Sequence, residues 1–83
     1  MIYKLYSIED VCSGYGNPVM IVKEELATRE FLNRCKKDLN PEDLRLWKVG
    51  EFDIETGEIK SFKPELIMKG EPHEMQISDT PRS

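Results

Sequence analysis

Apolar or aromatic residues alternate with polar ones over the first ten positions, MIYKLYSIED. A period of two is typical of a β-strand, so we expect a strand at 1–10. Tyr3 and Leu5 point to one side of it, and Tyr6 and Ile8 point to the other. Because both sides carry large apolar groups, both faces of this strand need a cover.

Glycine, asparagine and proline interrupt the chain at 12–18, CSGYGNP, which predicts a loop. The next run at 19–22, VMIV, is short, unbroken and rich in β-branched residues. Such a run is typical of a strand that is covered on both faces. We therefore expect a buried strand at 19–22.

From Lys23 the apolar residues follow a helical period. Ala27, Phe31 and Cys35 recur at every fourth position and form one apolar stripe. Glutamates at the start of this segment and lysines at its end complement the helix dipole. The pattern predicts one amphipathic helix, in which Cys35 is a small core residue.

Two more strands are expected in the second half of the chain, at 44–54 (LRLWKVGEFDI) and at 58–62 (EIKSF). The alternation in the first of them breaks at Gly50, which indicates a β-bulge that resets the inward-facing side chains. Residues 65–68, ELIM, are expected to dock as a short turn or strand. The polar remainder, 69–83, contains two prolines and is predicted to be a flexible tail.

Carboxylates concentrate around a Thr-Gly pair at 51–60, EFDIETGEIK, and three interpretations compete. A calcium loop requires a different ligand spacing and flanking helices. A catalytic pair of acids requires a pocket, a histidine or a nucleophile, which the neighbouring sequence does not offer. A hairpin turn accounts for every residue, since Asp53 can accept hydrogen bonds from nearby backbone N–H groups and Gly57 supplies a positive φ. We predict a hairpin, and no catalytic residue, metal or cofactor.

The predicted order β-β-α-β-β favours an α+β fold, a small antiparallel sheet with one helix packed on one face. The second face would carry Tyr3, Leu5, Trp47 and Val49, and no predicted element covers it. An uncovered apolar face in so small a chain is most simply buried against a second copy. We therefore expect a homodimer.

Size and composition favour one domain, which we assign to residues 1–68. A chain of 83 residues, 39% hydrophobic and 34% charged, can bury one modest core and has little left for a deep cleft, so no small-molecule substrate is expected. No apolar run approaches the roughly 20 residues that cross a bilayer. The N-terminus also has no signal-peptide pattern, so we expect a cytoplasmic protein without a membrane partner.

The residue types that commonly bind metals are few and scattered. Cys12 and Cys35 match no metal or redox spacing, and free thiols are favoured over a disulfide. His73, the single histidine, cannot build a metal site alone and is expected to be exposed to solvent.

Basic side chains occur near aromatic ones at two places. Arg29, Lys36 and Lys37 share one helix face by their spacing, and Lys48 follows Trp47 in the predicted hairpin. Such groups bind single-stranded nucleic acid through phosphate contacts and base stacking, so these five residues are our candidates. The alternative is a solvated helix face and an aromatic core. The net charge of −4 favours this alternative, because it opposes phosphate binding.

The run at 41–59, PEDLRLWKVGEFDIETGEI, resembles the hallmark of the small nonstructural proteins of gokushovirus-type microviruses, which are single-stranded DNA phages. This family is also catalogued as the phage open-reading-frame-five proteins. The matching residues are Pro41, Asp43, Leu46, Trp47, Val49, Gly50, Phe52, Asp53, Thr56, Gly57 and Ile59. Trp47 stands where a tyrosine is usual. Lys23 stands where a helix-capping residue is expected, which weakens the cap.

The resemblance implies an early phage protein that is absent from the virion and acts in the cytoplasm of the infected bacterium. Such proteins are assigned to genome replication, at the switch from duplex to single-stranded synthesis, with DNA binding. We expect a non-enzymatic replication accessory that binds single-stranded DNA or the replication machinery. The alternative is a protein-interaction module that binds and modulates a host protein, which fits the negative charge. The matching residues are scaffold residues, so the resemblance transfers no functional site.

Overall fold

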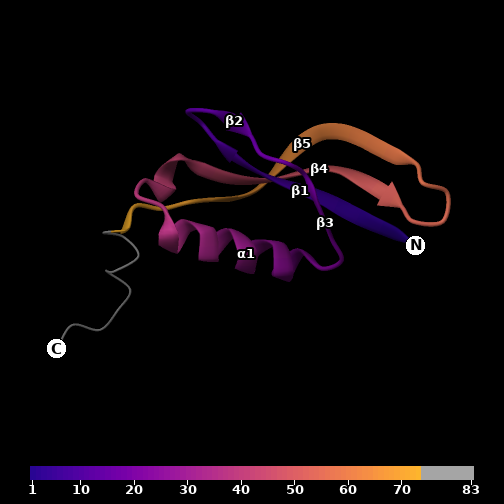
Figure 1. The fold of residues 1–83 in the computed structure, drawn as a ribbon, viewed down its shortest axis with the longest axis horizontal. Helices are drawn as coiled ribbons and strands as arrows, with labels where there is room; N and C mark the ends of the chain where they lie inside the picture. Colours follow the sequence, from indigo (N-terminus) through magenta and orange to yellow (C-terminus); the bar gives the residue numbers. More distant parts are fainter. Residues whose placement is uncertain (74–83) are drawn as a thin grey trace.

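Residues 1–73 are described by a computed structural model and form a small α+β fold (Figure 1). The elements in chain order are β1 (Ile2–Asp10), β2 (Gly14–Tyr15), β3 (Val19–Ile21), α1 (Glu24–Lys37), the 3₁₀ turn η1 (Pro41–Asp43), β4 (Leu44–Asp53) and β5 (Ile59–Lys69). The strands form one antiparallel sheet of five strands in the order β2-β1-β4-β5, with β3 also paired to β1. This confirms the predicted α+β class, the antiparallel sheet and the helix on one face. Within residues 1–73, no helix combines the length and apolarity needed to span a bilayer.

Two strands differ from the predicted ones. β2 is a two-residue strand within 12–18, where a loop is predicted. β5 is one continuous strand through Pro64, where a break is predicted. Proline is tolerated there because β5 lies at the edge of the sheet and its register with β4 is irregular in this part of the strand.

The core lies between α1 and the sheet. The helix buries Ala27, Phe31 and Cys35, which confirms the predicted apolar stripe and the core position of Cys35. Phe31 is 0% exposed, and burying a phenylalanine contributes about 1.5–3 kcal/mol to folding stability. The side chains that complete the buried cluster come from the sheet: Tyr6, Leu44 and Leu46.

The prediction of a buried strand at 19–22 is wrong. Val19, Met20 and Val22 are exposed, and Ile21 alone packs partly against the core. The physical reason is the position of β3, which pairs only with β1 and forms an edge of the sheet. The apolar run therefore predicts a strand correctly here, but it does not predict burial on both faces.

The predicted bulge in β4 is confirmed. Leu5 pairs with Gly50 and Tyr6 pairs with Lys48, so Val49 is an extra residue on β4. A Cβ atom at Gly50 would lie 2.5 Å from the carbonyl oxygen of Lys60, so the close approach of β5 requires glycine here.

The predicted hairpin at 51–60 is also confirmed. The N–H of Gly57 donates to the carbonyl of Asp53 (2.7 Å), and Gly57 has a φ of 78°. The N–H of Glu55 donates to the Asp53 carboxylate (2.9 Å). The acidic stretch is therefore a turn that joins β4 to β5.

The end of the described chain packs against the helix C-terminus. The N–H of Gly70 donates to the carbonyl of Leu44 (2.9 Å), and a Cβ atom at Gly70 would overlap the carbonyl of Pro41. His73, which is expected to be exposed, is half-buried, and its Nε2 donates to the carbonyl of Asp38 (2.6 Å). From residue 74 onward, the flexible tail predicted at 69–83 lies outside the described residues.

Lys23 occupies the N-cap of α1 with extended backbone (φ −121°, ψ 135°), and its side chain makes no capping hydrogen bond. Serine at this position could accept a hydrogen bond from a free N–H of the first helical turn. We expect Lys23→Ser to raise the free energy of unfolding by about 1 kcal/mol relative to Lys23→Ala, measured by urea unfolding. Equal stabilities of the two variants would contradict the uncapped N-terminus.

The backbone N–H groups of Glu55 and Thr56 lower the pKa of Asp53 below its ordinary value of 3.8. A carboxyl group with a lowered folded pKa stabilises the fold above its unfolded pKa, and this contribution disappears as pH falls through the folded pKa. We expect Asp53→Asn, which keeps an acceptor in the turn, to flatten the loss of stability below about pH 4. Urea midpoints measured against pH check this, with Glu30→Gln as the control for losing one carboxylate. An acid limb as steep as in the wild type would contradict the prediction.

Candidate nucleic-acid interface

The face of the sheet opposite α1 has no cover among the described elements. Side chains of directly paired residues share a face, and Tyr6 and Leu46 point toward α1, so their neighbours along each strand point away from it. We call this surface the open face. Its larger side chains are Tyr3, Leu5, Glu9, Tyr15, Met20, Arg45, Trp47, Phe52, Ile59, Leu66 and Lys69.

Most of the open face is accessible to solvent. Tyr15 is 52% exposed, and Leu66 is 43% exposed. Tyr3, Trp47 and Phe52 are half-buried. The aromatic rings on this side of the sheet therefore remain available for contact, and the second copy expected to cover them stays a prediction.

The bulge in β4 puts two aromatic residues on the same face. Trp47 and Phe52 are five positions apart, an odd number that would place them on opposite faces of a regular strand. Because Val49 is an extra residue, Trp47 pairs with Ser7 and Phe52 pairs with Tyr3, both on the open face. The irregularity of β4 is thus what assembles the aromatic surface.

Trp47 is held in place by two neighbours. Its indole Nε1 donates a hydrogen bond to Glu9 Oε1 (2.8 Å). Its ring centroid lies 6.1 Å from that of Tyr15, with a tilt of 50° between the rings. The Ser7 hydroxyl donates to the carbonyl of Gly16 (2.8 Å), which ties the β2–β3 connection to the sheet. One hydrogen bond and one ring contact therefore hold the Trp47 side chain in place.

A shallow hollow of about 280 Å³ lies on the open face beside Tyr15. The residues that line it come from both edges and the middle of the sheet: Ser7, Tyr15, Gly16, Pro18, Val49 and Pro64. Because the β2–β3 connection and β5 border the same hollow, the sheet curls around this face. The surface is an open trough and not a deep pocket.

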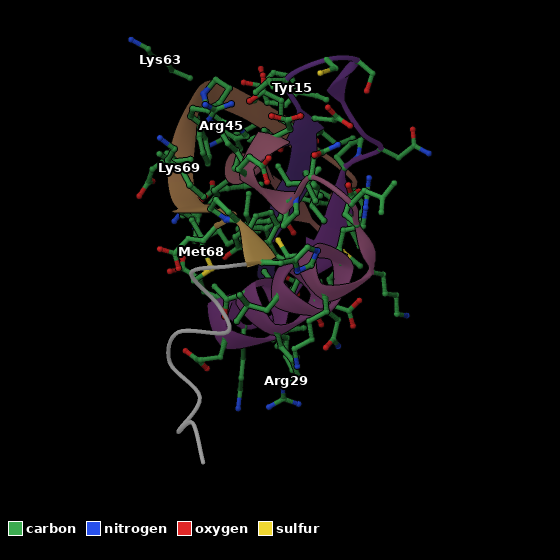
Figure 2. All side chains as sticks on the ribbon, turned by 90° about the vertical axis from the view of Figure 1, so that its left-hand side faces the viewer. Tyr15, Arg29, Arg45, Lys63, Met68 and Lys69 are labelled. Carbon is green, nitrogen blue, oxygen red and sulfur yellow. The ribbon has the colours of Figure 1, made fainter. Side chains whose placement is uncertain are left out.

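Two cations lie on the open face, and a third lies on the same flank of the molecule. Arg45 and Lys69 are directly paired across β4 and β5, and Figure 2 shows them with Lys63 on one flank of the protein. None of the three forms an ion pair with another residue in the range 1–73. Glu9 is the one acid that the register places on the open face within residues 1–73. The surface is therefore locally basic although the chain has a net charge of −4.

The structure does not bring the five candidate residues together. Arg29, Lys36 and Lys37 are exposed on α1, and Figure 2 shows Arg29 at the opposite end of the view from Tyr15. Lys48 points to the α1 side of the sheet and lies 3.9 Å from Glu24 and 3.6 Å from Glu65. Trp47 lies on the open face without the other four.

The residues that accompany Trp47 were not among the candidates, and sequence signals for them are weak. Arg45 is two positions before Trp47 in one strand, so strict alternation would have paired them. Tyr15 falls in the predicted loop and Lys69 in the predicted tail. Their approach to Trp47 depends on strand register, which no local pattern encodes.

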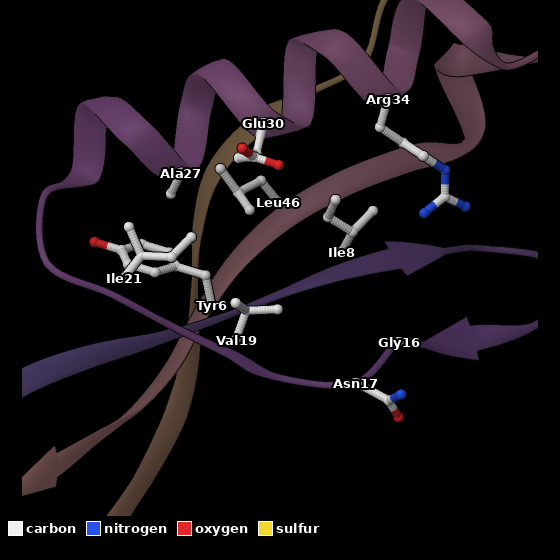
Figure 3. Close-up of a pocket in the computed structure, with 10 residues that line it drawn as sticks. All are labelled: Tyr6, Ile8, Gly16, Asn17, Val19, Ile21, Ala27, Glu30, Arg34 and Leu46. Carbon is white, nitrogen blue, oxygen red and sulfur yellow. The ribbon is translucent and has the colours of Figure 1, made fainter.

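A second cavity, of about 240 Å³, lies between α1 and the β1–β3 edge (Figure 3). It is lined mainly by apolar side chains, and Glu30 and Arg34 reach it from the helix. The residues that line it include no histidine, serine or cysteine. It is the gap left where a single helix meets an edge strand.

Asp10, Cys12 and Asp43 gather ligand-type atoms within 4.8 Å of one another at the surface. The Asp43 charge is the largest cause that raises the pKa of the Cys12 thiol, which keeps it protonated and a poor metal ligand. Cys12 and Cys35 are both free, as expected. Two half-buried acids beside an exposed thiol are not in themselves a metal site.

Comparison with known proteins identifies a family. Residues 3–72, most of the 83-residue chain, match the family described as phage ORF5 protein. No curated protein and no solved structure matches the chain significantly. The match includes the whole run at 41–59 that carries the resemblance to the phage open-reading-frame-five proteins. The chain therefore belongs to the phage ORF5 protein family.

Proposed function

We propose that this phage protein is a replication accessory that binds single-stranded DNA on its open face and acts by binding, not by catalysis. The observation that carries the proposal is that aromatic rings share one side of the sheet with Arg45 and Lys69, cations that form no ion pair within residues 1–73. Its resemblance to nonstructural proteins of single-stranded DNA phages supports the replication role.

Aromatic side chains bind single-stranded bases because an unpaired base offers its flat face. Stacking of one base on an aromatic side chain contributes about 1–3 kcal/mol and tolerates every base. Trp47 and Tyr15 offer such rings at one end of the open face, and Phe52 and Tyr3 offer them at the other. Duplex DNA keeps its base faces covered, so this surface favours single strands.

The spacing of the rings suits a strand that crosses several residues of β4. Trp47 and Phe52 pair with Ser7 and Tyr3, which are four positions apart on β1, so the two aromatic residues are about 13 Å apart at roughly 3.3 Å per residue. Stacked bases are about 3.4 Å apart along one strand, so the face can hold more than one base. Arg45 and Lys69 flank the Trp47 end, where they can neutralise phosphates.

The chain contains one tryptophan, so Trp47 is its own reporter. We expect a single-stranded oligonucleotide of about 12 nucleotides to quench Trp47 fluorescence at low salt, because a base stacks on the indole. A duplex of the same length should quench it much less. Unchanged fluorescence and unchanged anisotropy of a labelled single strand at low salt would sink the DNA part of the proposal.

Two pairs of charge-removing variants locate the binding surface. Arg45→Ala/Lys69→Ala should weaken binding and reduce the slope of log K against log salt by about 1.4, which is about 0.7 for each lost phosphate contact. Lys36→Ala/Lys37→Ala removes the same charge from α1 and should leave this slope nearly unchanged. Anisotropy titrations from about 50 to about 200 mM salt measure both slopes. A larger effect of the α1 pair would move the DNA site to the helix.

Exposed aliphatic residues on the open face favour a second candidate function, binding of a host protein or of a second copy. Ile59, Leu66 and Met20 lie among the rings, and such groups are typical of protein interfaces. In that case Trp47 fluorescence would respond to protein concentration or to a partner, and not to an oligonucleotide. Sedimentation at micromolar and higher concentration separates a second copy from a host partner.

A further inference from the structure

We propose that Glu9 makes the open face discriminate among bases, so that it favours cytosine and adenine over thymine beside Trp47. This inference rests on the proposed binding of single-stranded DNA. It adds a specificity-determining residue to a surface whose stacking groups tolerate every base.

Glu9 belongs to a row of side chains that crosses the strands at one end of the open face. It is directly paired with Arg45 on one side and with Tyr15 on the other. One carboxylate oxygen, Oε1, accepts the indole hydrogen bond of Trp47 at 2.8 Å. The other oxygen, Oε2, has no hydrogen-bond or ion-pair partner among residues 1–73. Glu9 is half-buried, so part of its side chain remains accessible beside Trp47.

A base stacked on Trp47 brings its edge toward Glu9, because the carboxylate lies against the rim of the indole. An ionised carboxylate accepts hydrogen bonds and donates none. Cytosine offers its N4 amino group and adenine offers its N6 amino group, and both can donate to Oε2. Thymine presents the O4 carbonyl at the position of the cytosine amino group. Its one donor, N3–H, lies between two carbonyls, whose lone pairs repel a carboxylate that approaches it.

The acid is not required for the other tasks of this surface. Phosphate binding is weakened by a carboxylate, and any acceptor could hold the Trp47 indole. A charged acceptor next to the stacking ring is therefore placed to receive a donor from the ligand. A hydrogen bond to a charged group corresponds to about a tenfold difference in affinity or somewhat more.

The test compares oligo(dC) with oligo(dT) of about 12 nucleotides, at one salt concentration, by quenching of Trp47. Both are pyrimidine strands, so differences in stacking are small. We expect oligo(dC) to bind about tenfold more tightly than oligo(dT). Oligo(dA) serves as a third ligand and should also exceed oligo(dT).

Glu9→Gln isolates the charged oxygen. Glutamine keeps an oxygen that accepts from the Trp47 indole, and it places an amide donor where the carboxylate stood. We expect the preference for oligo(dC) to disappear or to reverse, while both strands bind more tightly because one negative charge is gone. Glu30→Gln on α1 removes the same charge away from the open face and should leave the preference unchanged.

The outcomes separate this inference from the proposed function. Equal binding of oligo(dC) and oligo(dT) by the wild type overturns the role of Glu9 and leaves single-strand binding intact. A preference that persists in Glu9→Gln, with an unchanged urea midpoint, also overturns it. Absence of binding to all three oligonucleotides overturns both.

Discussion

The structure depends on the packing of one helix against one face of a curled sheet. Phe31, with Ala27 and Cys35 on the same stripe, fills the space above Leu44 and Leu46. With 83 residues the chain supplies a single 14-residue helix among its described elements, so only that face acquires a core. The consequence is an asymmetric molecule, in which the same strands are buried on one side and accessible on the other.

The bulge at Val49 determines which side chains point to each face of the sheet. On the α1 side it lets Lys48 join Tyr6 near Glu24, so the N-terminal end of the helix is tied to the sheet by polar contacts. On the other side it lets Trp47 and Phe52 point the same way despite an odd separation. One extra residue thus serves both the packing of the helix and the composition of the open face. Gly50 permits it, because β5 passes too close for a side chain.

The sequence pattern predicts an element correctly wherever that element depends on residues close together in the chain. The helical stripe, the Asp53–Gly57 turn and the bulge at Gly50 each depend on residues within a few positions of one another, and each was predicted. The length of β5 was not, because a strand that continues through Pro64 depends on its position at the edge of the sheet. The exposure of Val19 has the same origin. Burial depends on what lies opposite, and an apolar run does not contain that information.

The candidate site shows the same limit more sharply. The spacing of basic residues along a helix can be read from the sequence, which is why Arg29, Lys36 and Lys37 are among the predicted candidates. The set around Trp47 comes from three strands and a segment predicted to be tail, and only the register of the sheet brings it together. Of the five candidates, Trp47 alone belongs to this set. Lys48, its immediate neighbour, faces the other way and is occupied by carboxylates.

The negative net charge is compatible with a locally basic open face because the charges are segregated. Lys4 pairs with Glu51, and Lys48 lies near Glu24 and Glu65, so several acids are matched on the α1 side of the sheet. The acids on the outer side of α1 are separated from the open face by the thickness of a helix, about 10 Å. That distance exceeds the Debye length of about 8 Å at physiological salt, so these charges are largely screened there. Among residues 1–73 the register places Arg45 and Lys69 on the open face, against the carboxylate of Glu9. Net charge therefore describes the solubility of this chain better than it describes its binding surface.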